Sequence, residues 1–442
     1  MVIGLNHRTA SLAMRERFWI SEHRRYEILK QLKSAEGIEE VVVLCTCGRT
    51  EFMVWASEPT LAANSLLQFL SSEHGLRLTE WQHFYRLLDE SALMQLFRVT
   101  SGLDSLVLGE PQIVGQVKAA WQQASTVGAA GPFLNTAIDH ALAVSARVRG
   151  ETLVGKLAVS IPTAALELAR KIFGSLNGRK ILLLGTGKTS ELSARQMIEC
   201  GAGSVVVIDQ STARALEVAE RLGGTAASLN DRWKCMVGAD IVVSSTGCPH
   251  VILTHEEAER IATERNHVAL VILDLAMPRD VDPAVRRADG ILLYDLEGLE
   301  RAIRSSAPDR EAATVEAERI VYEEAHAFRN KLKAESAVPT VVALRQRLEE
   351  ICRQELESFI EERGPFSREQ DQSLHAITVQ IIKKIASSLA RELKELPEKA
   401  EQEQMTAAVT RLFHLQTPQQ ALAGTRSEKK DERERTAVAI NY

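Results

Sequence analysis

Long apolar runs are missing from this 442-residue sequence, and cysteine is scarce. No run approaches the roughly 18 apolar residues of a membrane-spanning helix, so we expect no membrane segment. Only six cysteines are present, mostly far apart, which favours a reducing compartment over a disulfide-stabilised fold. The first residues, 2–5, have the pattern of a strand rather than of a signal peptide, and we therefore expect a cytoplasmic protein.

An excess of positive charge is also missing. The formal net charge is −6, which argues against a general nucleic-acid-binding protein, although a local basic face can still contact phosphate. The chain is 45% hydrophobic and 25% charged, as is ordinary for a soluble globular protein. Its length suits roughly two or three domains, and no internal repeat divides it.

Residues 41–52 form the most informative stretch, because they join an apolar run to two cysteines and an arginine. The run predicts a buried strand that ends at Cys45 and Cys47, and Gly48 then allows a turn before Arg49. A thiol at a strand end near a guanidinium is a candidate nucleophile, because a nearby positive charge favours the thiolate. Alternatively, Cys47 is a small buried apolar residue. A Cys-x-Cys metal site is disfavoured, because no second pair of ligands lies nearby.

The first 150 residues have the pattern of a mixed α/β domain. Strands are expected at residues 2–5, 41–44 and 52–55, and a charged stretch at 22–34 predicts a helix. We interpret residues 1–150 as the catalytic, substrate-binding domain.

Two sets of polar residues in this domain are candidates for a site. His7 lies in a polar turn after the first strand, where it is either a turn residue or part of a site. Further polar residues interrupt an apolar segment between positions 97 and 118, namely Ser105, Glu110, Gln112 and Gln116. In a helix, Gln112 and Gln116 share one face. If buried they need partners such as a polar ligand, and otherwise they belong to a solvated helix face.

A second domain, residues 151–300, is predicted from a glycine-rich loop between a strand and a helix. The apolar strand 181–184 precedes the loop, and a helix is expected to begin near Glu191. Glycines allow a tight turn and the close approach of a pyrophosphate to the helix N-terminus. The predicted cofactor-binding residues are Gly185, Thr186, Gly187, Lys188, Thr189, Ser190 and Asp209.

The remainder of this domain supports a nucleotide-binding sheet. Asp209 ends a strand at 205–208 and follows Gly185 by 24 residues, the spacing of an acidic ribose-binding residue. A phosphate loop is excluded, because Leu182 stands where that motif requires glycine. Further strands are expected at 239–247, 271–276 and 291–295. Strands that alternate with helices predict a doubly wound parallel sheet, a Rossmann fold, with its ligand at the carboxyl ends of the strands.

The C-terminal part is wholly helical in pattern. Apolar residues recur at a spacing of four, as at Ile377, Ile381 and Ile385, which predicts long amphipathic helices over residues 301–424. They suit a helical linker and dimerisation domain, and a bundle packed within one chain is the alternative. Residues 425–442 are rich in mixed charge and predict a disordered tail.

Taken in order, four motifs resemble those of the glutamyl-tRNA reductase family. They are residues 4–10 (Gly-Leu-Asn-His-Arg-Thr-Ala), 46–51 (Thr-Cys-Gly-Arg-Thr-Glu), 101–118, and 244–247 with 278–280. The third motif is specific to that family, and the resemblance is close over about the first 350 residues. It implies the first committed enzyme of the five-carbon route to tetrapyrroles, including porphyrins and haem.

The resemblance also implies a reaction. Cys47 stands at the position of the family's nucleophile and is implied to attack the ester that joins glutamate to tRNA(Glu). A thioester forms, tRNA is released, and hydride from NADPH yields glutamate-1-semialdehyde. The implied substrate-binding residues are Thr46, Gly48, Arg49, Ser105, Glu110, Pro111, Gln112 and Gln116. Arg49 is implied to pair with the glutamate side chain, and Glu110 with its α-ammonium group.

The family's other partners are implied in the same way. Glutamyl-tRNA(Glu) is the implied substrate, and the C-terminal helices are implied to form a homodimer. The next enzyme of the pathway, glutamate-1-semialdehyde aminomutase, is an implied partner. Because the thiol and the cofactor belong to different domains, hydride transfer is expected to need a domain closure.

The sequence departs from the family pattern at five positions, two of which are the pair Asp209-Gln210 where the family has Asn-Arg. Gln95 replaces a histidine thought to assist catalysis, so acid–base help must come from elsewhere or be missing. Gly48 replaces asparagine, and Cys45 replaces serine, either as a redox partner of Cys47 or as a benign change. Asp209 stands where the family has asparagine, and its carboxylate favours NADH over NADPH because it repels a 2′-phosphate.

Two other functions fit part of the sequence. A weakened paralogue that binds glutamyl-tRNA or a partner enzyme in a regulatory role is favoured by Gln95, Gly48 and Asp209, but the retained Cys47 and Arg49 oppose it. A thiol-dependent dehydrogenase that acts on a small acyl substrate without tRNA is opposed by the family-specific third motif.

Overall fold

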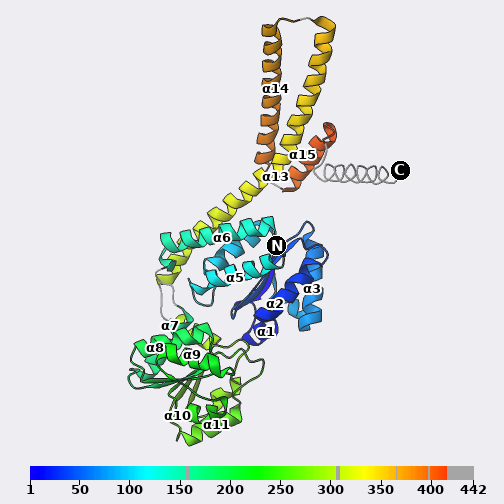
Figure 1. The fold of residues 1–442 in the computed structure, drawn as a ribbon. Helices are drawn as coiled ribbons and strands as arrows, with labels where there is room; N and C mark the ends of the chain where they lie inside the picture. The colour runs from blue at the N-terminus through cyan, green and yellow to red at the C-terminus, as the bar shows by residue number, and fades with distance from the viewer. Residues whose placement is uncertain (156–159, 305–308, 365, 397–398, 416–442) are drawn as a thin grey trace, which may run out of the picture. The chain divides into compact units, whose positions relative to one another are not determined.

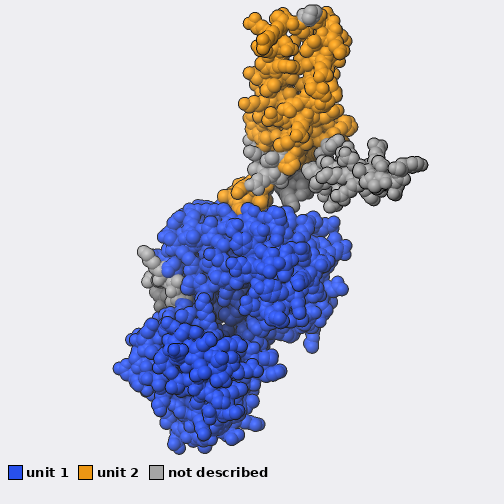
Figure 2. All heavy atoms as spheres, viewed as in Figure 1, with its two compact units in different colours: residues 1–325 blue, residues 326–442 orange. Residues whose placement is uncertain are grey.

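The computed structural model describes residues 1–155, 160–304, 309–364, 366–396 and 399–415. The chain divides into two compact units, residues 1–325 and residues 326–442 (Figure 2). The predicted catalytic and nucleotide-binding domains both belong to the first unit. The predicted tail, residues 425–442, lies outside the described residues.

An antiparallel sheet in the order β2-β3-β1-β4 forms the centre of the N-terminal domain. Its strands are β1 (Val2–Asn6), β2 (Glu40–Cys45), β3 (Arg49–Trp55) and β4 (Tyr85–Leu87). All residues of β1 and β2 are buried, as their apolar runs predict. The three strands predicted from the sequence are confirmed. The short β4 was not predicted, because it has no apolar pattern.

Six helices surround this sheet (Figure 1). They are α1 (Leu12–Arg17), α2 (Glu22–Lys33), α3 (Pro59–His74), α4 (Asp89–Thr100), α5 (Gln112–Thr126) and α6 (Pro132–Glu151). Ser11 and Ser21 begin the first two helices, because their side chains accept backbone N–H groups of the first turn. The helix predicted at 22–34 is confirmed as α2, and Gln112 and Gln116 both lie on α5.

The nucleotide-binding domain is built on a parallel sheet in the order β10-β9-β8-β5-β6-β7. Its strands are β5 (Lys180–Leu184), β6 (Ser204–Ile208), β7 (Thr225–Ala226), β8 (Ile241–Ser244), β9 (Leu270–Asp274) and β10 (Ile291–Asp295). The order confirms a doubly wound sheet, whose direction of winding reverses between β5 and β8. Ligands of such sheets bind outside the carboxyl ends of the strands at this point. Only the two-residue β7 was missed.

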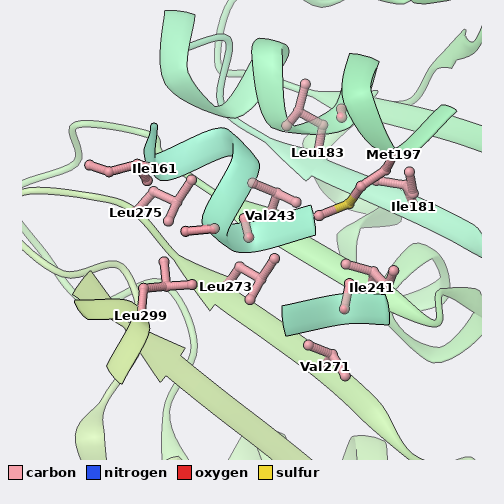
Figure 3. Packing of buried hydrophobic residues seen from close by; sticks show 14 of the residues in the cluster. Ile161, Ile181, Leu183, Met197, Ile241, Val243, Val271, Leu273, Leu275 and Leu299 are labelled. Atoms are coloured by element: carbon pink, nitrogen blue, oxygen red, sulfur yellow. The ribbon is translucent and has the colours of Figure 1, made fainter. Parts of the chain in front are cut away.

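Alternate residues of β5 point into different cores. Ile181 and Leu183 pack in one core with α7 (Ile161–Phe173), α8 (Lys188–Glu199), α9 (Thr212–Leu222) and α12 (Leu296–Arg304) (Figure 3). Leu182 and Leu184 pack in the other core with α10 (Arg232–Gly238) and α11 (His255–Glu264). The strand is therefore buried on both faces, which explains its continuous apolar run.

The core that contains Ile181 also includes residues of the N-terminal domain. Leu12, Leu106 and Val107 belong to it, and the partly buried Cys47 packs against it. The candidate thiol therefore lies where the two domains of the first unit meet.

The second unit is helical, as predicted. α13 (Asp309–Arg363) enters it, followed by α14 (Arg368–Glu395) and α15 (Lys399–Leu412) (Figure 1). α13 continues through Pro339 without ending. The hydrophobic core of the second unit is small. On α14, the apolar residues Ile377, Ile381 and Ile385 are 59%, 50% and 42% exposed. These side chains are thus largely exposed in the part of the chain that the structure describes. Among the helices that the structure describes, none is long and apolar enough to cross a membrane.

Candidate active site

Cys47 lies at the tip of the hairpin that joins β2 to β3. The hairpin closes where the N–H of Thr46 donates to the carbonyl of Arg49 at 2.9 Å. The Thr46 hydroxyl accepts the N–H of Gly48 at 3.2 Å. A Cβ atom added at Gly48 would lie 3.3 Å from Cγ of Leu106, so a side chain there needs only a small shift of a flexible neighbour.

Two groups hold the carbonyl oxygens of this tip. Nη1 of Arg15 donates to the carbonyl of Cys47 at 2.7 Å. The backbone N–H of His7 donates to the carbonyl of Gly48 at 2.9 Å. The backbone that directly follows the thiol is therefore fixed by residues distant in sequence.

The thiol of Cys47 is not ionised by its surroundings. Burial raises its pKa to about 12, and the Glu110 carboxylate acts in the same direction, while Arg15 opposes both. The expected lowering of this pKa by Arg49 is therefore wrong. Of the charges around the thiol, Arg15 provides the favourable one.

Arg49 is fully buried and already bound to acidic groups of the protein. Its Nη1 lies 2.9 Å from Oδ2 of Asp104 and 3.0 Å from Oε1 of Glu51. Nη2 also donates to the backbone carbonyl of Asp104. The sequence interpretation placed this guanidinium beside the thiol and on the substrate. In the structure, the guanidinium of Arg49 instead forms ion pairs with these carboxylates, because alternation along β3 puts Arg49 and Glu51 on one face.

Gln95 joins the same buried network as a neutral donor. Its Nε2 lies 2.8 Å from Oε1 of Glu51 and 3.1 Å from Oδ2 of Asp104. Tyr85 donates to Glu51, and Asn6 donates to Asp104 at 2.9 Å. Burial alone would raise the pKa of Asp104, but Arg49 and the hydrogen bonds from Gln95 and Arg49 outweigh it and lower that pKa. Arg8 adds a further ion pair, with Nε 3.3 Å from Oδ1 of Asp104, so the two carboxylates are held by two arginines and several neutral donors.

Beside this network, several buried polar atoms have no hydrogen-bond partner in the described structure. They are Nδ1 and Nε2 of His7, Oγ of Ser105 and Oε2 of Glu51. Burial, and then the charge of Arg49, lowers the pKa of His7 to about 3, so its imidazole is neutral near pH 7. Unpaired buried polar atoms are costly, and a polar ligand is one source of partners.

The loop before α5 is held in place from α6. Gly102 and Gly109 adopt φ values of +78° and +74°, which favour glycine. Nη1 and Nη2 of Arg149 donate to the carbonyls of Gly109 and Glu110, both at 2.9 Å. Burial raises the pKa of Glu110 to about 7, although Arg49 and Arg149 oppose it. This loop thus presents Glu110 as a carboxyl group that is poised to gain or lose a proton.

The remaining predicted substrate residues lie at the start of α5. Pro111 precedes the helix and is exposed, whereas Gln112 and Gln116 are half-buried one turn apart. Their shared face, expected from the sequence, is confirmed.

The glycine-rich loop follows β5 at the carboxyl edge of the sheet. Gly185 has φ +86°, and an added Cβ there would lie 2.3 Å from the carbonyl oxygen of Ser245. Gly187 is the N-cap of α8, which begins at Lys188, three residues before the predicted start at Glu191. The buried Ser190 donates to the carbonyl of Gly187 at 2.8 Å. The exposed N-terminus of α8 fits a pyrophosphate in charge and in free N–H groups.

Asp209, which follows β6, binds the glycine-rich loop through its side chain. Its Oδ2 accepts the N–H and the hydroxyl of Thr186 at 3.1 and 2.8 Å, and Oδ1 accepts the N–H of Ser211. The carboxylate therefore lies where a ribose-binding acid is expected, and it already supports the loop.

The two candidate sites meet directly. The hydroxyl of Thr189, a predicted cofactor residue, lies 3.5 Å from Oε1 of Gln112, a predicted substrate residue. Helix α1 adds a second connection, because Glu16 binds Arg279 through Oε1 and Oε2 at 2.8 and 2.7 Å. The predicted domain closure stays a prediction, and it starts from domains that are already in contact.

Sequence reasoning missed the residues that organise this site. Arg15, Glu51, Tyr85 and Asp104 were not singled out. An available signal was the alternation of Arg49 and Glu51 in an otherwise apolar strand, since buried charges are almost always paired. Arg15 gave no such signal, because it lies in an ordinary charged helix.

The chain resembles known proteins over nearly its whole length. Models of the glutamyl-tRNA(Glu) reductase N-terminal and dimerisation domains match residues 3–152 and 316–415, and a shikimate/quinate 5-dehydrogenase model matches residues 167–302. A glutamyl-tRNA reductase of Desulforudis audaxviator is 40% identical over 417 residues, which cover 94% of this chain and 93% of that protein. A glutamyl-tRNA reductase of Solibacter usitatus is 35% identical, covering 94% of this chain and 99% of the relative.

One solved structure extends this similarity to the fold. The glutamyl-tRNA reductase of Methanopyrus kandleri is 25% identical, with a TM-score of 0.51, and the match covers 94% of this chain and 98% of that chain. The three-part architecture is therefore shared.

Proposed function

Because the chain belongs to the glutamyl-tRNA reductase family, we propose that it reduces glutamyl-tRNA(Glu) to glutamate-1-semialdehyde through a thioester on Cys47. The observation that carries this proposal is the placement of Cys47 at a hairpin tip, against the core of the nucleotide-binding domain. The product would enter tetrapyrrole synthesis.

The reaction has two balanced steps. The sulfur of Cys47 attacks the ester carbonyl carbon, a C–S bond forms, and the C–O bond to the tRNA ribose breaks. The thiol proton passes to the leaving ribose oxygen, and free tRNA departs. A bound nicotinamide cofactor would supply the hydride for the second step, in which a C–H bond forms at the thioester carbonyl carbon, the C–S bond breaks, and the sulfur of Cys47 takes up a proton from solvent. The product is the aldehyde.

The glutamyl group would be held by residues on both sides of the thiol. The unpaired Ser105 hydroxyl and the half-buried Gln112 and Gln116 offer hydrogen bonds. The buried Glu110, whose pKa is about 7, would bind the α-ammonium group, and that positive charge would favour its ionised form. Thr46, Gly48, Arg49 and Pro111 complete the proposed set, with Arg49 acting through a network already bound to Asp104.

We assign His7 the part of a neutral hydrogen-bond donor in this chemistry. Gln95 donates to Glu51 and Asp104 and cannot exchange a proton near neutral pH. His7 is tied to Gly48 through its backbone, and both of its ring nitrogens are buried and unpaired. With its pKa lowered to about 3 the imidazole is a weak base, but a neutral imidazole can donate a hydrogen bond to a developing oxyanion. His7 thus replaces the missing histidine at position 95 in this proposal.

The cofactor residues are the glycine-rich loop and Asp209. Backbone N–H groups at the start of α8 would face the pyrophosphate, and Asp209 would accept from the ribose. NADPH is the cofactor implied by the family resemblance, and the Asp209 carboxylate favours NADH. The helical unit, with its exposed apolar face on α14, would form the homodimer. Docking of glutamate-1-semialdehyde aminomutase remains part of the proposal.

A single assay tests this function. The purified full-length chain and its Cys47→Ser variant are given glutamyl-tRNA with and without reduced cofactor. We expect semialdehyde from the wild-type protein only, and without cofactor a glutamyl group attached to Cys47. Free glutamyl thioester as the only accepted substrate would instead indicate a dehydrogenase that acts without tRNA.

Two observations favour a second function, that of a weakened paralogue in a regulatory role. The pKa of the Cys47 thiol is raised to about 12, and Gln95 cannot exchange a proton. Under this alternative, glutamyl-tRNA binds to the wild-type chain without turnover, and Cys47→Ser leaves that binding unchanged.

A further inference from the structure

Arg15 lies between the hairpin that carries Cys47 and a helix of the nucleotide-binding domain. Its Nη1 is 2.7 Å from the carbonyl oxygen of Cys47, and its Nη2 is 3.2 Å from Oε1 of Glu297. The Arg15 side chain is 2% exposed, whereas the Glu297 side chain is 40% exposed, so the guanidinium is buried while its carboxylate partner also reaches solvent. One guanidinium therefore touches the candidate nucleophile's backbone and the other domain at once.

Glu297 is held in this position by a second contact. Its Oε1 also accepts the backbone N–H of Leu12 at 2.8 Å, at the start of α1. Leu12 packs in the same core as Leu296 and Leu299 of α12. The Glu297 carboxylate is thus attached to α1 at two points. Because Glu297 belongs to the nucleotide-binding domain, its carboxylate moves with that domain.

The charges around Cys47 explain why Arg15 matters for ionisation of the thiol. Besides burial, which has the largest effect, the Glu110 carboxylate and the Cys45 thiol raise the pKa of the Cys47 thiol, and the Arg15 guanidinium lowers it. The ring of His7 is neutral near pH 7, and Arg49 is bound by Asp104 and Glu51. Arg15 is therefore the cation that favours a thiolate, and Glu297 partly neutralises it.

We propose that Arg15 is a positioning residue that fixes Cys47 and supplies its favourable charge, and that Glu297 controls how much of this charge reaches the thiol. The proposal rests on the proposed role of Cys47 as nucleophile. It adds a coupling between the nucleotide-binding domain and the reactivity of the thiol. When Glu297 withdraws, the charge of Arg15 is less neutralised and the thiol becomes more reactive.

The test measures alkylation of Cys47 by iodoacetamide in the full-length protein between pH 7 and 9. Peptide mass spectrometry reports the Cys47 rate, and the exposed Cys200 serves as an internal reference. Glu297→Gln keeps an acceptor for Arg15 and Leu12 but removes the negative charge. We expect Cys47 to react roughly threefold faster, since a thiol whose pKa falls by one unit gains thiolate but loses some nucleophilicity.

Two further variants separate the effect of the Arg15 charge from the effect of the contact between α1 and the nucleotide-binding domain. Arg15→Met removes the cation and is expected to slow alkylation by roughly three- to tenfold. Glu16→Gln weakens the contact between α1 and Arg279 without touching Arg15, and is expected to leave the Cys47 rate unchanged. If Arg15→Met does not fold, the comparison of Glu297→Gln with Glu16→Gln decides alone.

Equal rates in Glu297→Gln and Glu16→Gln would overturn the proposal, and so would a Cys47 rate that does not rise in Glu297→Gln. The test is independent of turnover, because it reads the thiol itself. If Cys47→Ser still forms semialdehyde, the proposed nucleophile is wrong while the measured coupling stands.

Discussion

The guanidinium of Arg49 is bound to the carboxylate of Asp104, with Nη1 2.9 Å from Oδ2, although 55 positions separate the two residues. Both side chains are buried, and the same nitrogen also binds Glu51. The arginine of the Cys47 hairpin is therefore an anchor whose charge is already balanced. Its main contribution is to hold the start of β3 against the loop that carries Asp104.

This relationship predicts a large loss of stability in Arg49→Met. We expect the free energy of unfolding of the N-terminal domain to fall by roughly 3–5 kcal/mol, because two buried carboxylates lose their cation. Urea unfolding followed by tryptophan fluorescence measures it, since Trp19, Trp55, Trp81 and Trp121 all lie in this domain.

The matched control for that variant is Arg24→Met. Arg24 is 53% exposed and pairs with Glu27 and Glu73 at the surface. Its loss should cost less than about 1 kcal/mol. Similar losses in the two variants would contradict the structural role of Arg49.

His7→Gln should lower turnover by roughly 10²-fold or more, because the loss of one well-placed donor to a developing oxyanion costs on that order. Cofactor binding and the alkylation rate of Cys47 should change little. Because burial and Arg49 lower the pKa of His7 to about 3, the wild-type rate should show no titration of this imidazole between pH 5 and 8. The exposed His23 provides the control His23→Gln, and equal turnover in both variants would exclude His7 from the chemistry.

Glu110→Gln should change how stability depends on pH. Burial raises the pKa of Glu110 from 4.5 to about 7. Between these values the folded state keeps a proton that the unfolded state releases, so Glu110 makes the protein less stable as pH rises from 4.5 to 7. The variant should therefore be more stable than wild type at pH 8, by on the order of 1–3 kcal/mol, and similar at pH 4.5.

Urea midpoints at the two pH values measure this difference. The exposed Glu36 supplies the control Glu36→Gln, which should follow the wild-type pH dependence. An unchanged pH dependence in Glu110→Gln would show that Glu110 is ionised in the folded protein.

Asp209→Asn should shift cofactor preference toward NADPH. The carboxylate repels a 2′-phosphate, whereas an amide can still accept the N–H of Thr186. The ratio of kcat/KM for NADH to that for NADPH should exceed one in the wild type and fall by roughly tenfold in the variant. A strong preference of the wild type for NADPH would refute the assigned role of Asp209.

Local pattern was enough for the architecture of this chain. The apolar runs at Ile181–Leu184 and at Val41–Leu44 predicted buried strands, and Gly185 with Gly187 located the nucleotide loop, because these features depend on neighbours in sequence. The order of the motifs indicated the family. Short elements without a pattern, such as β4 and β7, could not be found in this way.

Long-range contacts decided the chemistry of the site. From its position in the sequence, Arg49 was expected to activate Cys47, but the fold binds it to Asp104 and places Arg15 at the hairpin instead. Arg15 and Cys47 are 32 residues apart, and Arg15 and Glu297 are 282 apart. Sequence by itself determined which elements form and where the thiol stands, since periodicity and turn residues act locally. Only the tertiary structure decided which charge faces which group, because side-chain partners depend on how distant elements pack.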